Sequence, residues 1–166
     1  NDAGLETAQE TLSEAVRYIL SAGYLPVLLG GGHEITYGHA RGIYNFLAQQ
    51  TPVPTAGLIN FDPHFDLRVP GPSGANSGTS FWQLAQDCRQ HAVPFNYLAL
   101  GIQAHSNNAQ LFRTAAELGV KHIPADAFHM MDRTTLFEAI HSFLQQTERL
   151  YVTVDLDVFA APFAPV

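Results

Sequence analysis

The stretch Asn-Phe-Asp-Pro-His-Phe-Asp-Leu-Arg at residues 60–68 constrains this chain more than any other part of it. It follows the apolar run 56–59, which reads as a buried strand. Asp62, His64 and Asp66 alternate at a spacing of two, and in an extended segment that period places all three side chains on one face. Carboxylates on one face repel each other unless a cation or a proton lies between them. The stretch therefore predicts a metal site at the end of a strand.

Two other predicted strands end in side chains of the same kind. Asp155 and Asp157 follow the apolar run 150–154, again at a spacing of two, and His33 follows the glycines 30–32. Carboxylate and imidazole ligands without cysteine suit Mn, Zn, Ni or Fe. A hydroxide held between two such cations would be a nucleophile at neutral pH, so we expect a two-metal hydrolytic site. The candidate ligands are His33, Asp62, His64, Asp66, Asp155 and Asp157.

Each of these side chains also has an ordinary structural interpretation. An aspartate after a strand is a common turn former or helix cap, and His33 alone could be a satisfied core histidine. Residues 30–32 could cradle a phosphate, but neither a dinucleotide fingerprint nor a P-loop pattern is present. The other histidines and the single cysteine, Cys88, have no activating surroundings and are interpreted as packing or surface residues. The joint occurrence of the candidate ligands at three strand ends favours the metal site.

Hydrophobic periodicity predicts helices and strands in alternation along the chain. Helices are expected over about residues 5–22, 36–49, 80–92, 109–118 and 134–146. Strands are expected over about residues 25–29, 56–61, 95–101, 120–123 and 150–154. Residues 69–78, with two prolines and three glycines, read as a loop that shapes a pocket. This order predicts a three-layer α/β/α fold with a mainly parallel sheet, and ligand sites beyond the carboxyl ends of its strands.

Length and composition narrow the functional classes. The 166 residues suit a single domain, and a hydrophobic content of 46% supports a sizeable core. A net charge of −7 without a basic patch argues against a nucleic-acid partner, and no apolar run approaches the ~20 residues of a membrane span. One cysteine fits a reducing, cytoplasmic location. The chain has no initial methionine and stops soon after the second carboxylate pair, so we expect an incomplete domain.

Three motifs taken together resemble the arginase/agmatinase ureohydrolase family. They are Leu-Gly-Gly-Gly-His-Glu at 29–34, Asn-Phe-Asp-Pro-His-Phe-Asp at 60–66 and Thr-Val-Asp-Leu-Asp at 153–157. Within this family the chain is most similar to the formimidoylglutamases of histidine degradation. Residues 76–81 and 100–103 support this similarity. The resemblance implies that residues 1–166 form part of a single arginase-like catalytic domain, without its first strand and its C-terminal part.

The resemblance also implies roles for individual residues. His33, Asp62, Asp66 and Asp155 would hold one manganese ion, and Asp62, His64, Asp155 and Asp157 would hold the second. A hydroxide bridging the two ions would attack the formimino carbon of N-formimidoyl-L-glutamate, releasing formamide and L-glutamate. Arg68 would bind a carboxylate of this small-molecule substrate through its bidentate guanidinium, with Asn76 and Gln103 as further candidates. Asp66 and Ser77 are the candidate catalytic residues. The relatives commonly form trimers or hexamers, which implies a homo-oligomer.

The chain departs from arginases and agmatinases at several positions. Gly32 stands where they carry an aspartate, Ser77 stands where they carry a proton-shuttling histidine, and residues 160–162 replace their Asp-Pro step. The departures at Gly32 and Ser77 argue against an arginase or agmatinase, so formimidoylglutamate is the expected substrate, with arginine, agmatine or guanidinobutyrate as the alternative. A metallophosphoesterase is disfavoured because its Asp-x-His motif precedes its glycine–histidine string, which is the reverse of the order here. A non-catalytic fragment is the third alternative.

Overall fold

The computed structural model describes residues 3–160 and 162–164, except for the side chains of residues 3 and 129. The chain forms two compact units. Unit 1 comprises Asn1–Pro54 and Asp66–Val93, and unit 2 comprises Thr55–Phe65 and Pro94–Val166. The chain therefore passes from unit 2 to unit 1 within the central motif, between Phe65 and Asp66. The expectation that both units belong to one domain stays a prediction.

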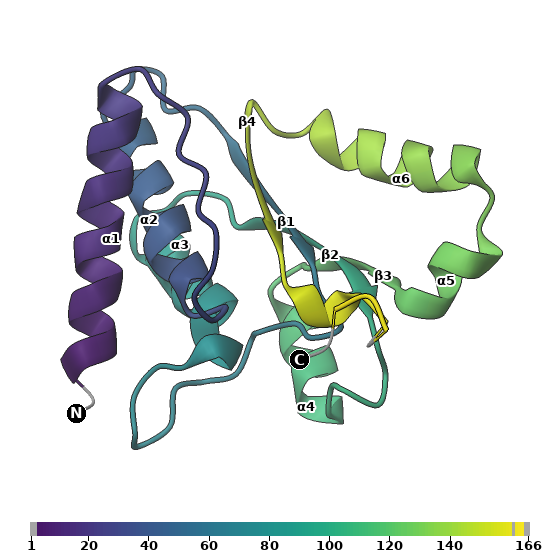
Figure 1. Cartoon of the computed structure of the whole chain (residues 1–166). Coiled ribbons are helices and arrows are strands. Elements are labelled where there is room, and N and C mark those ends of the chain that lie inside the picture. Colours follow the sequence, from purple (N-terminus) through teal and green to yellow (C-terminus); the bar gives the residue numbers. More distant parts are fainter. Residues whose placement is uncertain (1–2, 161, 165–166) are drawn as a thin grey trace. The chain divides into compact units, whose positions relative to one another are not determined.

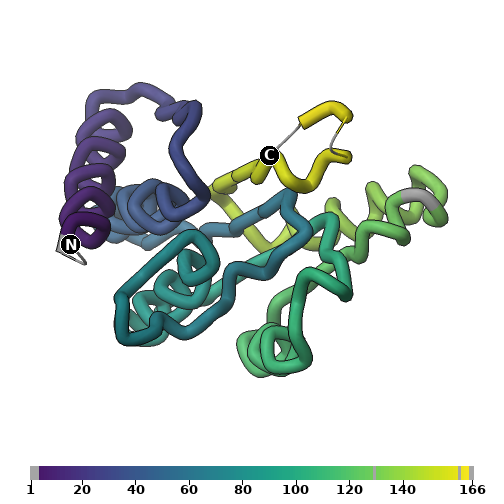
Figure 2. The backbone as a smooth tube through the Cα atoms, turned by 60° about the horizontal axis from the view of Figure 1, so that its bottom comes forward, coloured from purple at the N-terminus to yellow at the C-terminus, as the bar shows by residue number. Residues whose placement is uncertain are grey.

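Unit 1 is helical in the part that the structure describes. Its helices are α1 (Ala3–Ser21), α2 (Ile35–Leu47) and α3 (Ser80–Gln90), which begin and end close to the predicted bounds. Helices α1 and α2 lie side by side (Figures 1 and 2). Their backbones approach closely because α2 carries glycines at the contact. A Cβ at Gly38 would lie 2.7 Å from the Gln9 carbonyl oxygen, and one at Gly42 would lie 2.5 Å from that of Ser13.

The predicted strand at residues 25–29 is wrong. Gly23 ends α1 at a φ of +83°, as expected for a helix C-cap. The following residues are irregular, and no strand in the described part of the chain pairs with them. Leu25, Val27 and Leu29 are exposed. An apolar run indicates a buried strand only where neighbouring strands take up its backbone groups, and here the described residues supply none.

Unit 2 contains a parallel four-stranded sheet, which confirms the predicted α/β class (Figure 1). The strands are β1 (Ala56–Phe61), β2 (Asn96–Ile102), β3 (Lys121–Pro124) and β4 (Arg149–Val154), in the order β3-β2-β1-β4. The central motif therefore leaves the sheet from an inner strand, β1, which pairs with β2 on one side and with β4 on the other.

Helices cover both faces of this sheet, which confirms the predicted three layers. They are α4 (Ala109–Glu117), α5 (Ala125–Met130) and α6 (Arg133–Leu144). On one face, Ile59, Leu100 and Ile123 form a core with Phe143 of α6, against which α5 also packs. Strand side chains alternate between faces, so the neighbouring His122 points to the other side. There its ring contacts Phe112 of α4, with ring centroids 6.0 Å apart.

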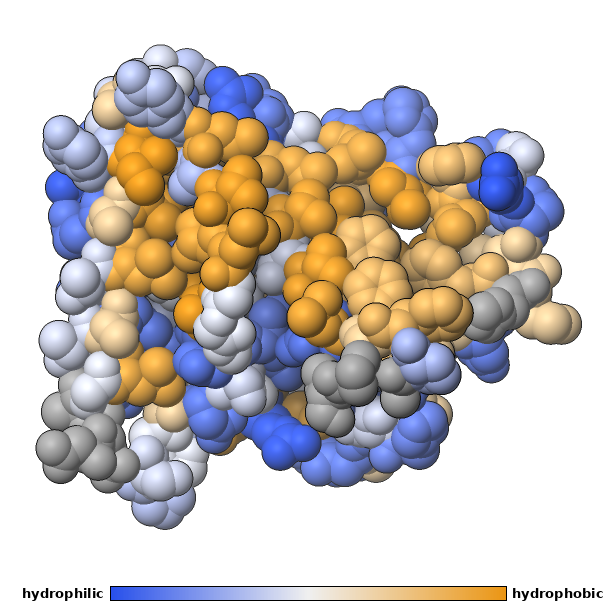
Figure 3. All heavy atoms as spheres, in the orientation of Figure 1, coloured by the Kyte–Doolittle hydropathy of each residue, from blue (hydrophilic) through white to orange (hydrophobic). Residues whose placement is uncertain are grey.

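One outer edge of the sheet is apolar. β4 is the last strand on its side among the residues that the structure describes. Its side chains Leu150, Val152 and Val154 are each close to half exposed, at 44%, 48% and 47%. Figure 3 shows apolar side chains on the surface along β4 and α6. This surface is a feature of unit 2 that the apolar pattern of the strand alone did not reveal.

Candidate metal centre

The carboxyl ends of β1 and β4 bring two aspartates of unit 2 next to each other. Phe61 pairs with Val154 in the parallel register. The pairing continues beyond the strands, because the Asp155 N–H donates to the Phe61 carbonyl at 2.9 Å and the Asp62 N–H to the Leu100 carbonyl at 3.0 Å. Asp62 and Asp155 therefore emerge at the strand edge where ligand sites gather in parallel sheets.

Both aspartates fold back onto their own backbone. Asp62 Oδ1 accepts the His64 N–H at 2.7 Å, and Asp155 Oδ1 accepts the Asp157 N–H at 3.3 Å. The second contact caps the short 3-10 helix η2 (Leu156–Val158). The predicted extended alternation after each strand is therefore wrong, because aspartate side chains stabilise turns at these positions. These residues are turn formers and candidate ligands at once, and the turn is what orients the carboxylate.

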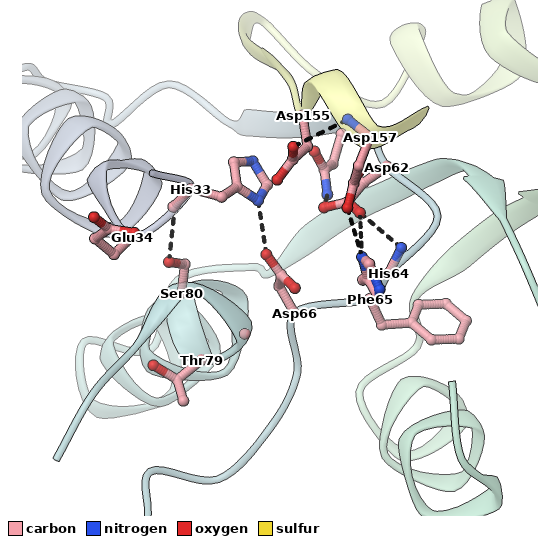
Figure 4. Close-up of polar contacts among 12 residues, drawn as sticks. His33, Glu34, Asp62, His64, Phe65, Asp66, Thr79, Ser80, Asp155 and Asp157 are labelled. Carbon is pink, nitrogen blue, oxygen red and sulfur yellow. Dashed lines mark hydrogen bonds and ion pairs between the residues drawn. The ribbon is translucent and has the colours of Figure 1, made fainter. Parts of the chain in front are cut away.

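Three candidate ligands of unit 2 form one cluster (Figure 4). His64 Nδ1 lies 3.2 Å from Asp62 Oδ1 and 3.2 Å from Asp157 Oδ2. One ligand atom from each of the three side chains lies within 4.8 Å of the others. The Asp62 side chain is fully buried, whereas that of His64 is 37% exposed. Two carboxylates this close require a compensating positive charge, and the set of oxygen and nitrogen donors fits a divalent cation.

Two further candidate ligands, His33 and Asp66, form a pair within unit 1. His33 Nδ1 lies 2.7 Å from Asp66 Oδ2, and both side chains are at least nine-tenths buried. The Ser80 hydroxyl donates to the His33 carbonyl at 3.3 Å (Figure 4). At the start of α3, the N–H groups of Phe81 and Trp82 donate to the Asp66 carbonyl at 3.1 and 3.3 Å. These N–H groups of the first helical turn thus hold the backbone of Asp66 in place.

The predicted ligands therefore lie in two groups. Unit 2 carries Asp62, His64, Asp155 and Asp157, and unit 1 carries His33 and Asp66. Within each group the structure supplies carboxylate and imidazole groups near one another. The assembly of both groups into a single two-metal centre stays a prediction.

Three other predicted site residues lie in the loop before α3. Arg68 is exposed, and its backbone N–H donates to the Gly78 carbonyl at 2.9 Å. Asn76 caps the 3-10 helix η1 (Ser77–Thr79), where its Oδ1 accepts the Gly78 N–H at 3.0 Å. Ser77 is the exposed first residue of that helix. Asn76 therefore has a structural role of its own, and its predicted contact with a substrate stays a prediction, as do those of Arg68 and Ser77.

Gln103 lies beyond the end of β2, in unit 2. Its N–H donates to the Pro63 carbonyl at 3.0 Å, and its carbonyl accepts from Asn107 Nδ2 at 2.9 Å. The sequence analysis did not single out Asn107, which is buried and also bonds the Phe65 N–H and the Pro63 carbonyl, at 3.0 and 2.7 Å. A single asparagine in a loop carries no motif, so no sequence signal could have indicated that it clamps the turn bearing His64.

Two further observations concern the cysteine and the described helices. Burial raises the pKa of the Cys88 thiol to about 11, which fits a packing residue and not a nucleophile. Among the described helices, none combines the length and the apolar character that crossing a membrane demands.

Comparison with known proteins identifies the class of protein to which this fold and these residues correspond. The sequence profile of the Arginase family matches residues 2–166, and the chain belongs to this family. Curated relatives are formimidoylglutamases. That of Clostridium tetani is 38% identical over 161 residues, covering 97% of this chain and 48% of the relative. That of Chromobacterium violaceum is 40% identical over 164 residues, covering 99% and 51%.

Solved structures show the same fold. The formimidoylglutamase from Bacillus subtilis superimposes with a TM-score of 0.82 at 24% identity, covering 96% of this chain and 48% of that one. The arginase from Bacillus caldovelox gives a TM-score of 0.82 at 21% identity, covering 99% and 57%. The resemblance to the arginase family is thereby confirmed, with formimidoylglutamases among the relatives. The chain spans about half the length of the curated relatives it matches.

Proposed function

We propose that this chain is part of a binuclear manganese hydrolase that cleaves N-formimidoyl-L-glutamate to L-glutamate and formamide. The observation that carries the proposal is the cluster of Asp62, His64 and Asp157 at the end of β1 and β4. It occurs in a chain of the arginase family whose curated relatives, at 36–40% identity, are named formimidoylglutamase. A fold shared with arginases would not by itself separate formimidoylglutamate from a guanidino substrate.

In this proposal, all of the predicted ligands bind the two manganese ions. They are His33, Asp62, His64, Asp66, Asp155 and Asp157. When bound, a pair of manganese ions supplies a Lewis acid and lowers the pKa of water to near neutrality. Contacts within the chain orient these ligands. The turns at Asp62 and Asp155 fix the two carboxylates, and the Asp66 carboxylate fixes the ring of His33.

The substrate part of the proposal rests on Arg68. Among the described residues its guanidinium has no carboxylate partner, in a chain with only eight lysines and arginines against fifteen acidic residues. A planar guanidinium suits a carboxylate, and formimidoylglutamate carries two. Asn76 and Gln103 would assist at the same pocket. Asp66 and Ser77 are the proposed catalytic residues, and Ser77 takes the position of the proton-shuttling histidine of arginases and agmatinases.

We further propose a cytoplasmic homo-oligomer that acts on a small molecule and has no nucleic-acid or membrane partner. The net charge of −7 argues against a nucleic-acid partner, because it would repel a phosphate backbone. The single, buried cysteine is compatible with a reducing compartment. The oligomer is proposed from the resemblance to the family alone.

A substrate panel tests the proposed function. The whole protein that carries this chain is loaded with Mn²⁺ and assayed with formimidoylglutamate, arginine, agmatine and guanidinobutyrate, measuring formamide and urea. Formamide from formimidoylglutamate alone is the expected result. Arg68→Ala should raise the KM for that substrate about 10- to 100-fold, the value of a charged hydrogen bond, while Arg113→Ala, at an arginine bonded to Gln110, should not. Urea release from a guanidino compound would overturn the substrate assignment.

A further inference from the structure

Asn60 is a polar side chain in the middle of a buried strand. It lies on β1 between Ile59 and Phe61, and its exposure is 0%. A buried amide is costly unless its groups are hydrogen-bonded. Asn60 Nδ2 donates to Asp62 Oδ2 at 3.0 Å and to the Tyr97 hydroxyl at 3.2 Å. Both N–H groups of this amide are therefore committed, one of them to a predicted metal ligand.

Tyr97 fixes the direction of these hydrogen bonds. It lies on the adjacent strand β2 and is 1% exposed. Its hydroxyl donates to the Phe65 carbonyl at 3.1 Å, and a carbonyl can only accept. The hydroxyl oxygen of Tyr97 is thus the acceptor for Asn60. The opposite orientation of the amide would place Asn60 Oδ1 against the Asp62 carboxylate, so electrostatics selects the orientation described.

The amide of Asn60 is retained at a cost to stability. Its Oδ1 is buried and has no hydrogen-bond partner among the described residues. Burying an acceptor without a partner destabilises the fold, whereas an apolar residue in this strand would carry no such cost. A local feature that stability does not explain is typical of a functional site. The Nδ2 group, and not packing, is then the reason for an asparagine at this position.

The two oxygens of Asp62 are held by different donors. Oδ2 accepts from Asn60, and Oδ1 accepts the His64 N–H. Because the two donors lie on different oxygens, the carboxylate cannot rotate freely about its bond to the rest of the side chain. We infer that Asn60 and Tyr97 are positioning residues that hold the Asp62 carboxylate in the orientation that binds metal. This inference rests on the proposed metal role of Asp62, and it adds a supporting layer that orients a ligand before the cation arrives.

Metal titration of the whole protein tests this inference. Mn²⁺ is titrated calorimetrically into metal-free wild type, Asn60→Ala and Tyr97→Phe, and the Mn²⁺ electron paramagnetic resonance spectrum is recorded. Asn96→Ala is the matched control, because it removes an amide hydrogen bond between β1 and β2 at the opposite end of these strands. The unfolding temperature of every metal-free variant is measured alongside.

Asn60→Ala should weaken Mn²⁺ binding about 10- to 100-fold, the usual effect of losing a residue that orients a ligand. Tyr97→Phe, which keeps its ring and packing, should give a smaller loss with a changed resonance spectrum. Asn96→Ala should leave affinity and spectrum unchanged even where it lowers the unfolding temperature. Wild-type affinity and spectrum in folded Tyr97→Phe, or an equal loss in Asn96→Ala, would overturn the inference. Wild type that binds no Mn²⁺ would instead overturn the proposed function on which it rests.

Discussion

At Asp66 a candidate ligand coincides with an unusual backbone conformation. Its φ is +50°, in the left-handed region where aspartate is tolerated better than most residues but still less favourably than glycine. The position therefore combines a local cost with a carboxylate that holds His33. Mutation can therefore separate the effect of the backbone conformation on stability from the effect of the carboxylate.

We expect Asp66→Gly to be more stable than Asp66→Ala by about 1 kcal/mol, because glycine relieves the left-handed conformation while both variants lose the carboxylate. Asp66→Asn should be the least perturbed of the three in stability, since it keeps a hydrogen-bonding group toward His33 and tolerates a positive φ. Urea unfolding of the metal-free protein measures the order. Equal stabilities of the glycine and alanine variants would show that the backbone at this position carries no strain.

His39 predicts a pH dependence in unit 1. Burial lowers its pKa from 6.5 to about 4, so the folded chain takes up its proton later than the unfolded chain as the pH falls. Stability should therefore be unaffected above pH 6.5 and should decrease between pH 6.5 and 4, by no more than about 3 kcal/mol. Urea unfolding across this range, compared with His39→Gln, isolates the contribution. A wild-type profile parallel to that of the variant would refute it.

At the scale of elements, the contact between α1 and α2 depends on two glycines. Alanine is a better helix former than glycine by about 1 kcal/mol, so an exposed site would gain stability. At Gly42, however, the new Cβ would lie 2.5 Å from a backbone oxygen of α1. We expect Gly42→Ala to lower the free energy of unfolding by about 1–3 kcal/mol. Gly4→Ala, where nothing lies within 4 Å, is the control and should be neutral or stabilising. Thermal unfolding measures both.

The elements show which parts of the fold could be predicted from sequence. The strand at 56–61 was predicted to the residue, and the helix expected over about residues 134–146 is α6, where the Asp132 side chain accepts the Thr135 N–H. Helix α5 (Ala125–Met130) was missed because six residues are too few to show a helical period. The run at 25–29 has strand-like residues, but a strand is defined by its neighbours, which lie elsewhere in the sequence.

The candidate site was predicted in its residue types and only in part in its geometry. The period of two in the central motif suggested an extended chain, yet the capping contact of the Asp62 carboxylate bends it directly after β1. Asn60 and Tyr97 were not found, because an asparagine or tyrosine inside a strand belongs to no motif. Their role becomes visible only in the structure, where the Asn60 amide donates both to the Tyr97 hydroxyl and to the Asp62 carboxylate.

For the whole molecule, metal binding should contribute to stability. The cluster of Asp62, His64 and Asp157 brings two carboxylates together, and a bound cation would offset their repulsion. Mn²⁺ at a hundred times its dissociation constant should add about 2.7 kcal/mol to the free energy of unfolding. Thermal unfolding with Mn²⁺ or with a chelator measures this gain.

Asp157→Asn provides the matched test of the same cluster. It should be at least as stable as wild type in the chelator, because one of the repelling charges is gone, and it should lose the gain that Mn²⁺ confers. This pattern is characteristic of residues kept for function at the expense of stability. A variant that unfolds earlier than wild type without metal, yet still responds fully to Mn²⁺, would argue that Asp157 is a structural cap and not a ligand.

The half-exposed side chains of β4 have a consequence for handling the protein. Val152 lies on the outermost described strand of a parallel sheet. An edge strand of this kind can form backbone hydrogen bonds with another extended chain. We expect the 166-residue chain, prepared alone, to self-associate in light scattering, and Val152→Lys to keep it dispersed. A monodisperse wild type would contradict this expectation. A single lysine at this position would make the exposed edge strand hydrophilic, while the candidate ligands that follow the strand, Asp155 and Asp157, would be unchanged.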